Sequence, residues 1–239
     1  MTSVTRGLAR WSPVGRTYAG RMPNTPPSPP LDGREGPASV LALLGAGDLV
    51  AFSWLSADAD LAPALGARES LARAAAERMG HYDVVAAMLD EAVGTHEGVT
   101  PYLGFLEEVG GRMEAMSWEE QLLRTAVMGG MVHDLGDVLA QLLPAEQRER
   151  VMQGASAPDD VVIDLMAGRL SQDEPLRARL SLWGRRVAGE ALAVLPAVVA
   201  QIADAAGDRR EAVTALQAPA AATMSSRHAQ RMERLGLAA

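Results

Sequence analysis

Three ionisable residues fall at positions where two amphipathic helices are expected to present apolar side chains to a core. Between residues 39 and 55, steps of three and four connect Leu41, Leu44, Asp48, Ala51 and Leu55. Between residues 63 and 93, the same steps connect Leu71, Ala74, Arg78, His81, Val85 and Met88. Such spacing places these side chains on one face of each helix. Because a buried charge is costly unless it is paired or bound to a metal, Asp48, Arg78 and His81 predict a polar functional site inside the core.

The elements that would position these residues are long helices. We expect helices over residues 39–56, 63–93, 117–143, 175–206 and 209–235, shorter ones that begin at Pro144 and Pro158, and a less regular segment over 101–115. Ser117 and Glu120 form a capping box for the third helix. Pro196 is expected to kink the helix over 175–206, and Pro219 to interrupt the last one. No strand pattern is visible, so the sequence predicts an all-α, up-and-down bundle.

The composition supports a helical core and excludes several kinds of chemistry. Hydrophobic residues make up 48% of the 239 residues and aromatic residues only 4%, which favours helix over sheet. The absence of cysteine excludes disulfides, zinc–thiolate sites, iron–sulfur clusters and thiol catalysis. It also fits the reducing cytoplasm, where we expect the protein to reside.

The charge and hydropathy of the chain limit its partners. A net charge of −8 disfavours non-specific binding to nucleic acid, because neutralisation of phosphates supplies most of that affinity. The longest apolar run, residues 191–202, contains Pro196 and Gln201 and is too short to span a bilayer. We therefore expect neither a membrane nor non-specific nucleic acid as a partner.

The first part of the chain differs from the rest. It carries four arginines before its first acidic residue, Asp32, and then a proline-rich stretch. We expect a disordered tail over residues 1–37, followed by one helical domain over residues 38–239. No apolar core of a secretory signal is present, so export is not expected. Met22 is an alternative start, which leaves open whether residues 1–21 belong to the native protein.

Several stretches of the domain carry a family resemblance. They are residues 47–52 (GDLVAF), 60–63 (DLAP), 80–82 (GHY), 182–192 (LWGRRVAGEAL) and 231–237 (RMERLGL). These stretches resemble a group of actinobacterial ferritin-like proteins that are similar to the tRNA-modifying hydroxylase acting on methylthio-isopentenyladenosine. The resemblance covers the chain from Val40 onward. It implies a ferritin-like four-helix bundle with additional C-terminal helices.

The resemblance also implies a di-iron centre inside the bundle, held by carboxylates and by Glu-x-x-His pairs. Asp48 matches the first carboxylate, and His81 matches the first histidine. Three residues before His81, where the family has glutamate, this sequence has Arg78. Glu77 replaces that ligand poorly, because its side chain points about 100° away from that of Arg78.

The other expected ligands are also incomplete. The inward carboxylate of the third helix would fall near residues 128–130, where there is none, and His133 and Asp134 lie a turn later. For the second Glu-x-x-His pair the nearest match is Ala157 with Asp160, which lacks both the glutamate and the histidine. A retained metal would have only Asp48, His81 and Asp160, beside the fixed positive charge of Arg78. We therefore expect that the protein holds neither a di-iron centre nor another cofactor. The alternative is that it retains iron.

Two further features have more than one interpretation. Glu190 lies on an apolar stripe, where it would serve either as a counter-ion or as a functional acid. We hypothesise that Arg78 bridges Asp48 and Glu190 in a vestigial metal pocket. In the alternative, Arg78 reaches solvent. His133 and Asp134 are adjacent, so one of the two is expected to be solvated. His96 and His228 are assigned no role.

The sequence therefore favours a divergent ferritin-like protein with a degenerate di-iron site, acting as a non-catalytic binding or scaffold protein. The alternative is an iron-dependent oxygenase or hydroxylase with an altered mononuclear site. The residues that would supply such a site are Asp48, His81, Asp160 and the pair His133–Asp134. A third interpretation is assembly of a homo-oligomer through the long helices, above all the helix over 175–206. The substrate or ligand is not predicted.

Overall fold

The computed structural model describes residues 36–92, 94–153, 159–170 and 173–239 of the chain. Within them the helices are α1 (Gly36–Asp60), α2 (Leu65–Ala92), α3 (Thr95–Gly111), α4 (Trp118–Arg124), α5 (Gly130–Leu139), α6 (Ala145–Met152), α7 (Asp159–Leu170), α8 (Glu174–Ala205), α9 (Arg210–Ala215) and α10 (Gln217–Arg234). No strand occurs among these residues, so the all-α prediction is confirmed. The predicted tail up to residue 35 and Ala157 lie outside the described residues.

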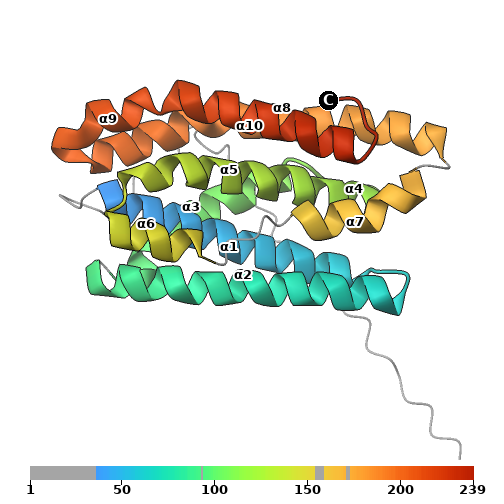
Figure 1. The fold of residues 1–239 in the computed structure, drawn as a ribbon, viewed down its shortest axis with the longest axis horizontal. Helices are drawn as coiled ribbons and strands as arrows, with labels where there is room; N and C mark the ends of the chain where they lie inside the picture. The colour runs from blue at the N-terminus through green and yellow to red at the C-terminus, as the bar shows by residue number, and fades with distance from the viewer. Residues whose placement is uncertain (1–35, 93, 154–158, 171–172) are drawn as a thin grey trace, which may run out of the picture.

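The long helices lie side by side with roughly parallel axes (Figure 1). Helix α2 forms one edge of the bundle, α1 packs along it, α4 and α5 occupy the middle, and α8 with α10 form the opposite edge (Figure 1). Helix α3 packs against α1, and the short helices α6 and α7 contact α2. A side chain on α1, α2 or α5 that points inward therefore reaches the centre of the bundle.

The prediction of a less regular segment over residues 101–115 was wrong. Helix α3 runs through Pro101 as far as Gly111. Pro101 removes only one backbone hydrogen bond, whereas Tyr102, Phe105 and Val109 bury an apolar face. Packing of that face against the core outweighs the cost of the proline.

The helix predicted over residues 117–143 has the predicted start but an unpredicted interior. The Ser117 hydroxyl accepts a hydrogen bond from the Glu120 amide at 3.3 Å, while the Glu120 carboxylate accepts one from the Met116 amide at 2.7 Å. After α4 the chain forms a π-helical turn over Thr125–Gly129 before α5 begins. Such turns add one residue to the helix and are frequent at functional sites.

The last two predicted helices are found with small changes. Helix α8 continues through Pro196. The final helix is interrupted as predicted, because α9 ends at Ala215, four residues before Pro219. The proline ring would clash with the Ala215 carbonyl in a continuous helix, so α10 starts afresh at Gln217.

Two glycines let α1 and α5 approach each other closely. A Cβ atom at Gly47 would lie 2.8 Å from Cγ1 of Val132, and one at Gly136 would overlap the side chain of Leu44. Larger residues at either position would push the two helices apart. This close approach places Asp48, next to Gly47, opposite the inward face of α5.

Two helices are long and apolar enough to cross a membrane by length and composition. They are Pro37–Asp60, with a mean hydropathy of 1.7, and Glu174–Ala205, with a mean hydropathy of 1.5. In the bundle, 67% of the first apolar window and 50% of the second are buried against other helices. Core helices of helical bundles commonly pass the same test.

Candidate functional site

Asp48, Arg78 and His81 meet in the centre of the bundle. Their exposed fractions are 7%, 3% and 7%, respectively. Nδ1 of His81 lies 2.6 Å from Oδ2 of Asp48, and Nη1 of Arg78 lies 3.5 Å from Oδ1 of the same carboxylate. Of the two alternatives for Arg78, the structure shows the buried ion pair with Asp48 and not a side chain that reaches solvent.

His81 is held by oxygen atoms at both ring nitrogens. Nε2 lies 2.9 Å from the carbonyl oxygen of Val151 in α6, and Nδ1 faces Asp48. A carbonyl oxygen only accepts hydrogen bonds, so Nε2 is placed to donate to Val151, and Nδ1 is placed to donate to the Asp48 carboxylate. The imidazolium form of His81, in which both ring nitrogens donate, satisfies both contacts and leaves no nitrogen lone pair for a metal.

The pKa of His81 follows from the same contacts. Burial alone lowers it, but the hydrogen bond and the charge of Asp48, together with the Val151 carbonyl, outweigh burial and the charge of Arg78. The pKa of His81 consequently lies above its ordinary value of 6.5. The positive charge of the imidazolium is thus stabilised around neutral pH.

A small cavity of about 30 Å³ adjoins this cluster. It is lined by Leu44, Gly47, Asp48, Ala51, Arg78, His81, Gly129, Val132 and His133. The volume suits a water molecule or another very small molecule, not an organic substrate. A substrate-sized pocket would require displacement of side chains that are now packed.

His133 and Asp134 both face inward, contrary to the expectation that one of them would be solvated. Asp134 is completely buried, and His133 lines the cavity with its Nε2 atom 3.8 Å from Oδ1 of Asp137. Burial lowers the pKa of His133, against the opposing charge of Asp137. His133 is therefore neutral at neutral pH, in contrast to His81.

The donor atoms around Asp48 do not fit an iron centre. Both Asp48 oxygens face cationic groups, and both His81 nitrogens are engaged with oxygen acceptors. Arg78 adds a fixed positive charge that repels a metal cation. Within the part of the chain that the structure describes, no three His, Asp or Glu side chains are arranged to hold a metal ion.

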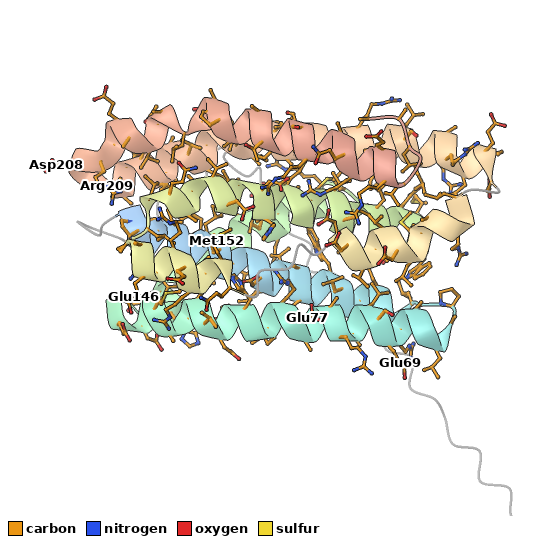
Figure 2. All side chains as sticks on the ribbon, viewed as in Figure 1. Glu69, Glu77, Glu146, Met152, Asp208 and Arg209 are labelled. Atoms are coloured by element: carbon orange, nitrogen blue, oxygen red, sulfur yellow. The ribbon has the colours of Figure 1, made fainter. Side chains whose placement is uncertain are left out.

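The other carboxylates considered for the pocket or as ligands lie elsewhere. Glu190 is half-buried on α8, which packs mainly against α4, α9, α10 and α1, and it does not line the cavity beside Arg78. The side chain of Asp160, considered as a ligand only if a metal is retained, is 58% exposed and binds Arg234 at 2.8 Å. It does not line the cavity beside Asp48 and His81. Glu77 is exposed on α2 (Figure 2), a quarter turn or so from the core face. Only Asp48 and His81 of the considered ligands are therefore in contact with each other.

A second buried ion cluster was not predicted. Arg231 of α10 forms a two-pronged contact with Asp134, with Nη1–Oδ2 at 2.7 Å and Nη2–Oδ1 at 2.8 Å. Its Nε lies 2.5 Å from Oδ2 of Asp159, and its Nη2 donates to the Gly130 carbonyl at 3.1 Å. Arg227 binds Asp134 from the outer side at 2.9 Å. Burial lowers the pKa of Arg231, but the two carboxylates outweigh it and raise that pKa, so Arg231 remains charged.

The sequence signal that locates Arg231 is the one that located Asp48. Steps of three and four along α10 connect Met224, His228 and Arg231 with the buried Leu235. His228, which was assigned no role, is 7% exposed, and neither of its ring nitrogens has a hydrogen-bond partner among the described side chains and backbone. Burial, and then the charge of Arg231, lower the pKa of His228, so it remains neutral.

A third unpredicted group, Asp58, continues the stripe on α1 three residues beyond Leu55. It is completely buried, and its Oδ2 accepts a hydrogen bond from the Thr125 hydroxyl at 2.7 Å. Its Oδ1 has no partner among the described residues. Burial raises the pKa of Asp58 from 3.8 to about 6, although the Thr125 hydroxyl and the charge of Arg124 act in the opposite direction. The carboxyl group of Asp58 therefore titrates near pH 6, well above the range of an exposed aspartate.

Comparison with known proteins agrees with this architecture. The family described as "Ferritin-like domain, actinomycetes" matches residues 33–209, which include α1 to α8 and the cluster around Asp48. No curated protein matches the sequence. The match covers most of the chain, and the structure within it is entirely helical in its regular elements. The chain therefore belongs to the actinomycete family of ferritin-like domains.

Proposed function

We propose that this protein is a non-catalytic binding or scaffold protein in which ion pairs replace the di-iron centre of its ferritin-like ancestors. The observation that carries the proposal is the position of Arg78. Its guanidinium lies 3.5 Å from the Asp48 carboxylate, three residues before His81 on the same helix, where a ferritin-like metal site has glutamate. Side chains of the protein itself then supply both the cationic groups and the carboxylate of this cluster, and the core requires no metal.

The energetics of the core support this proposal. Two buried cations and one carboxylate are stable only if their hydrogen-bonding groups are satisfied. Asp48 faces a cation at each oxygen, and the second nitrogen of His81 is satisfied by the Val151 carbonyl. A cluster arranged in this way specifies how α1, α2 and α6 pack, which is a structural role.

An iron-dependent oxygenase or hydroxylase, similar to the tRNA-modifying enzymes that the sequence resembles, is the second candidate. One observation favours it: Asp48, His81 and His133 line the same cavity. Two histidines and one carboxylate are the ligand types of mononuclear iron oxygenases. Arg78 and the engaged His81 nitrogens oppose it, because binding would require His81 to lose a proton and rotate.

Metal content after anaerobic loading with ferrous iron distinguishes the candidates. The full-length protein is loaded, desalted and measured by elemental mass spectrometry, with the melting temperature recorded with and without iron. We expect only trace iron and an unchanged melting temperature. A content of about two irons per chain would restore the di-iron enzyme, and about one would support the mononuclear oxygenase.

A scaffold protein would also need a surface that binds a partner or a second copy of the chain. Assembly through the long helices stays a prediction, and the exposed Leu182 on α8, at 65%, lies on the helix concerned. Light scattering of the purified protein measures the oligomeric state directly. A monomer at all concentrations would remove homo-oligomerisation from the proposed scaffold role.

A further inference from the structure

The cluster around Arg231 joins a part of the chain that lies inside the family match to a part that lies outside it. Its acceptors, Asp134 of α5 and Asp159 of α7, lie inside the matched ferritin-like domain, which ends at residue 209. Arg231 lies on α10, which begins at Gln217 and is outside the match. The domain thus supplies the acceptors, and the C-terminal segment supplies the cation.

The acceptors are arranged for a planar guanidinium and not simply for a positive charge. Asp134 receives Nη1 and Nη2 through its two oxygens, at 2.7 and 2.8 Å, which is the parallel geometry that a guanidinium provides. Asp159 receives Nε, and the Gly130 carbonyl receives the remaining Nη2 hydrogen. An ammonium ion has no such fork and could satisfy only part of this set.

The backbone at Gly130 leaves space for the same group. A Cβ atom at this position would overlap Nε and Cζ of Arg231, so any side chain other than hydrogen would exclude the guanidinium. The π-helical turn Thr125–Gly129 ends immediately before Gly130 and sets the direction in which α5 starts. The shape and the charge of this site therefore both fit a guanidinium group.

We propose that the ferritin-like domain contains a binding site for a guanidinium ion, and that the chain's own Arg231 occupies it. Asp134 and Asp159 form the charged walls, with exposed fractions of 0% and 3%, and Gly130 forms the floor. Arg227, whose side chain is 42% exposed, closes the outer side. Occupation of this site fastens α10 to the matched domain. These residues are not those around Asp48. The measurement of iron uptake therefore tests the proposed function, and the loss of the guanidinium site is tested separately.

Chemical rescue tests the site. The variant Arg231→Ala removes the ligand, and we expect its melting temperature to fall by about 10 °C because two buried carboxylates lose their partner. Methylguanidinium at about 10 mM should then restore several degrees by binding the folded state, whereas methylammonium at the same concentration should not. The matched control is Arg234→Ala, whose exposed pair with Asp160 should be worth at most about 2 °C and should respond to neither ion.

Further variants keep the outcome decisive. Arg231→Lys retains the charge but not the fork, so we expect it to lose most of the stability that Arg231→Ala loses. If Arg231→Ala does not fold, adding Asp134→Asn and Asp159→Asn should restore folding, since no uncompensated charge then remains. Equal responses of Arg231→Ala to the two ions, a wild-type-like Arg231→Lys, or failure of the Asn substitutions to restore folding would each overturn the guanidinium site.

Discussion

Nδ1 of His81 lies 2.6 Å from Oδ2 of Asp48, and this contact joins α2 to α1 in the centre of the bundle. The other oxygen of Asp48 faces Arg78, so two cationic side chains share one carboxylate. In a metal-binding bundle the carboxylate and the imidazole would both direct lone pairs at a metal ion. Here each directs its polar atoms at another side chain or at the backbone.

Replacement of Asp48 by asparagine should destabilise the protein in a pH-dependent way. The variant leaves two buried cations without a counter-ion, which should cost about 3 kcal/mol near pH 6. Because the folded-state pKa of His81 lies above 6.5, its contribution is fully present below pH 6.5 and is lost as the pH rises through the folded pKa. The difference in unfolding free energy between wild type and Asp48→Asn should therefore shrink as the pH rises above 6.5, without vanishing, because the variant also removes the ion pair with Arg78.

Urea unfolding between pH 5.5 and 8.5 measures this difference. Asp164→Asn on α7 is a suitable control, because this residue is exposed and its removal should change little at any pH. A difference for Asp48→Asn that stays constant across the range would mean that His81 does not carry its charge in the folded state.

Replacement of Arg78 by glutamate should create a metal site. The substitution removes the positive charge and places a carboxylate three residues before His81, on the same face of α2, opposite Asp48. We expect Arg78→Glu to bind one Mn²⁺ ion at least about tenfold more tightly than Arg78→Gln, which removes the charge without adding a ligand. Isothermal titration calorimetry compares the two variants with the wild type. Equal affinities in both variants would show that the fixed charge alone, and not the missing ligand, excludes the metal.

Asp58 should destabilise the protein at neutral pH. Its pKa is 3.8 in the unfolded chain and about 6 in the folded protein, so the folded state binds this proton more tightly. Stability from this group is present below pH 3.8 and is lost as the pH rises through 6. Asp58→Asn retains an acceptor for the Thr125 hydroxyl and should therefore stabilise the protein by about 2 kcal/mol at pH 8, with no effect below pH 4.

Thermal unfolding at pH 4, 6 and 8 separates this effect from a general change in packing. Asp60→Asn, at a side chain that is 82% exposed, should change the melting temperature little at any of the three pH values. A loss of stability in Asp58→Asn at pH 8 would mean that the ionised carboxylate is stabilised by Arg124 more than it is penalised by burial.

The helical stripe located part of the candidate site but not all of it. It identified Asp48, Arg78 and His81, because these residues interrupt strongly apolar faces that a single sequence shows plainly. Asp58 lies on the same stripe, one step beyond Leu55. It was missed because the predicted helix ended at residue 56, whereas α1 ends at Asp60. Element ends are the least certain part of such a prediction.

The stripe on α10 points to Arg231, but local patterns could not identify the partners of Arg231. Asp134 and Arg231 are 97 residues apart, and nothing in either helix alone indicates its partner. The exposed position of Asp160 illustrates a related difficulty. Its neighbour Asp159 is the buried residue, and a shift of one position on a helix turns a side chain by about 100°, from solvent to core. Family spacing alone did not resolve that shift.

Replacement of Gly130 by alanine should expel Arg231 from its site. A Cβ atom there would overlap Nε and Cζ of Arg231, both held by contacts to Asp134 and Asp159 on the other side. Since the guanidinium cannot move without losing these contacts, Gly130→Ala should lower stability by about 3 kcal/mol, although alanine is intrinsically the better helix former. Gly80→Ala on α2 is the matched control, because nothing lies within 4 Å of its Cβ position, and it should stabilise the protein by up to about 1 kcal/mol. Hydrogen exchange of α10 provides a second measurement: Gly130→Ala should accelerate exchange there, and unchanged exchange together with a stabilised fold would show that Arg231 relocates at no cost.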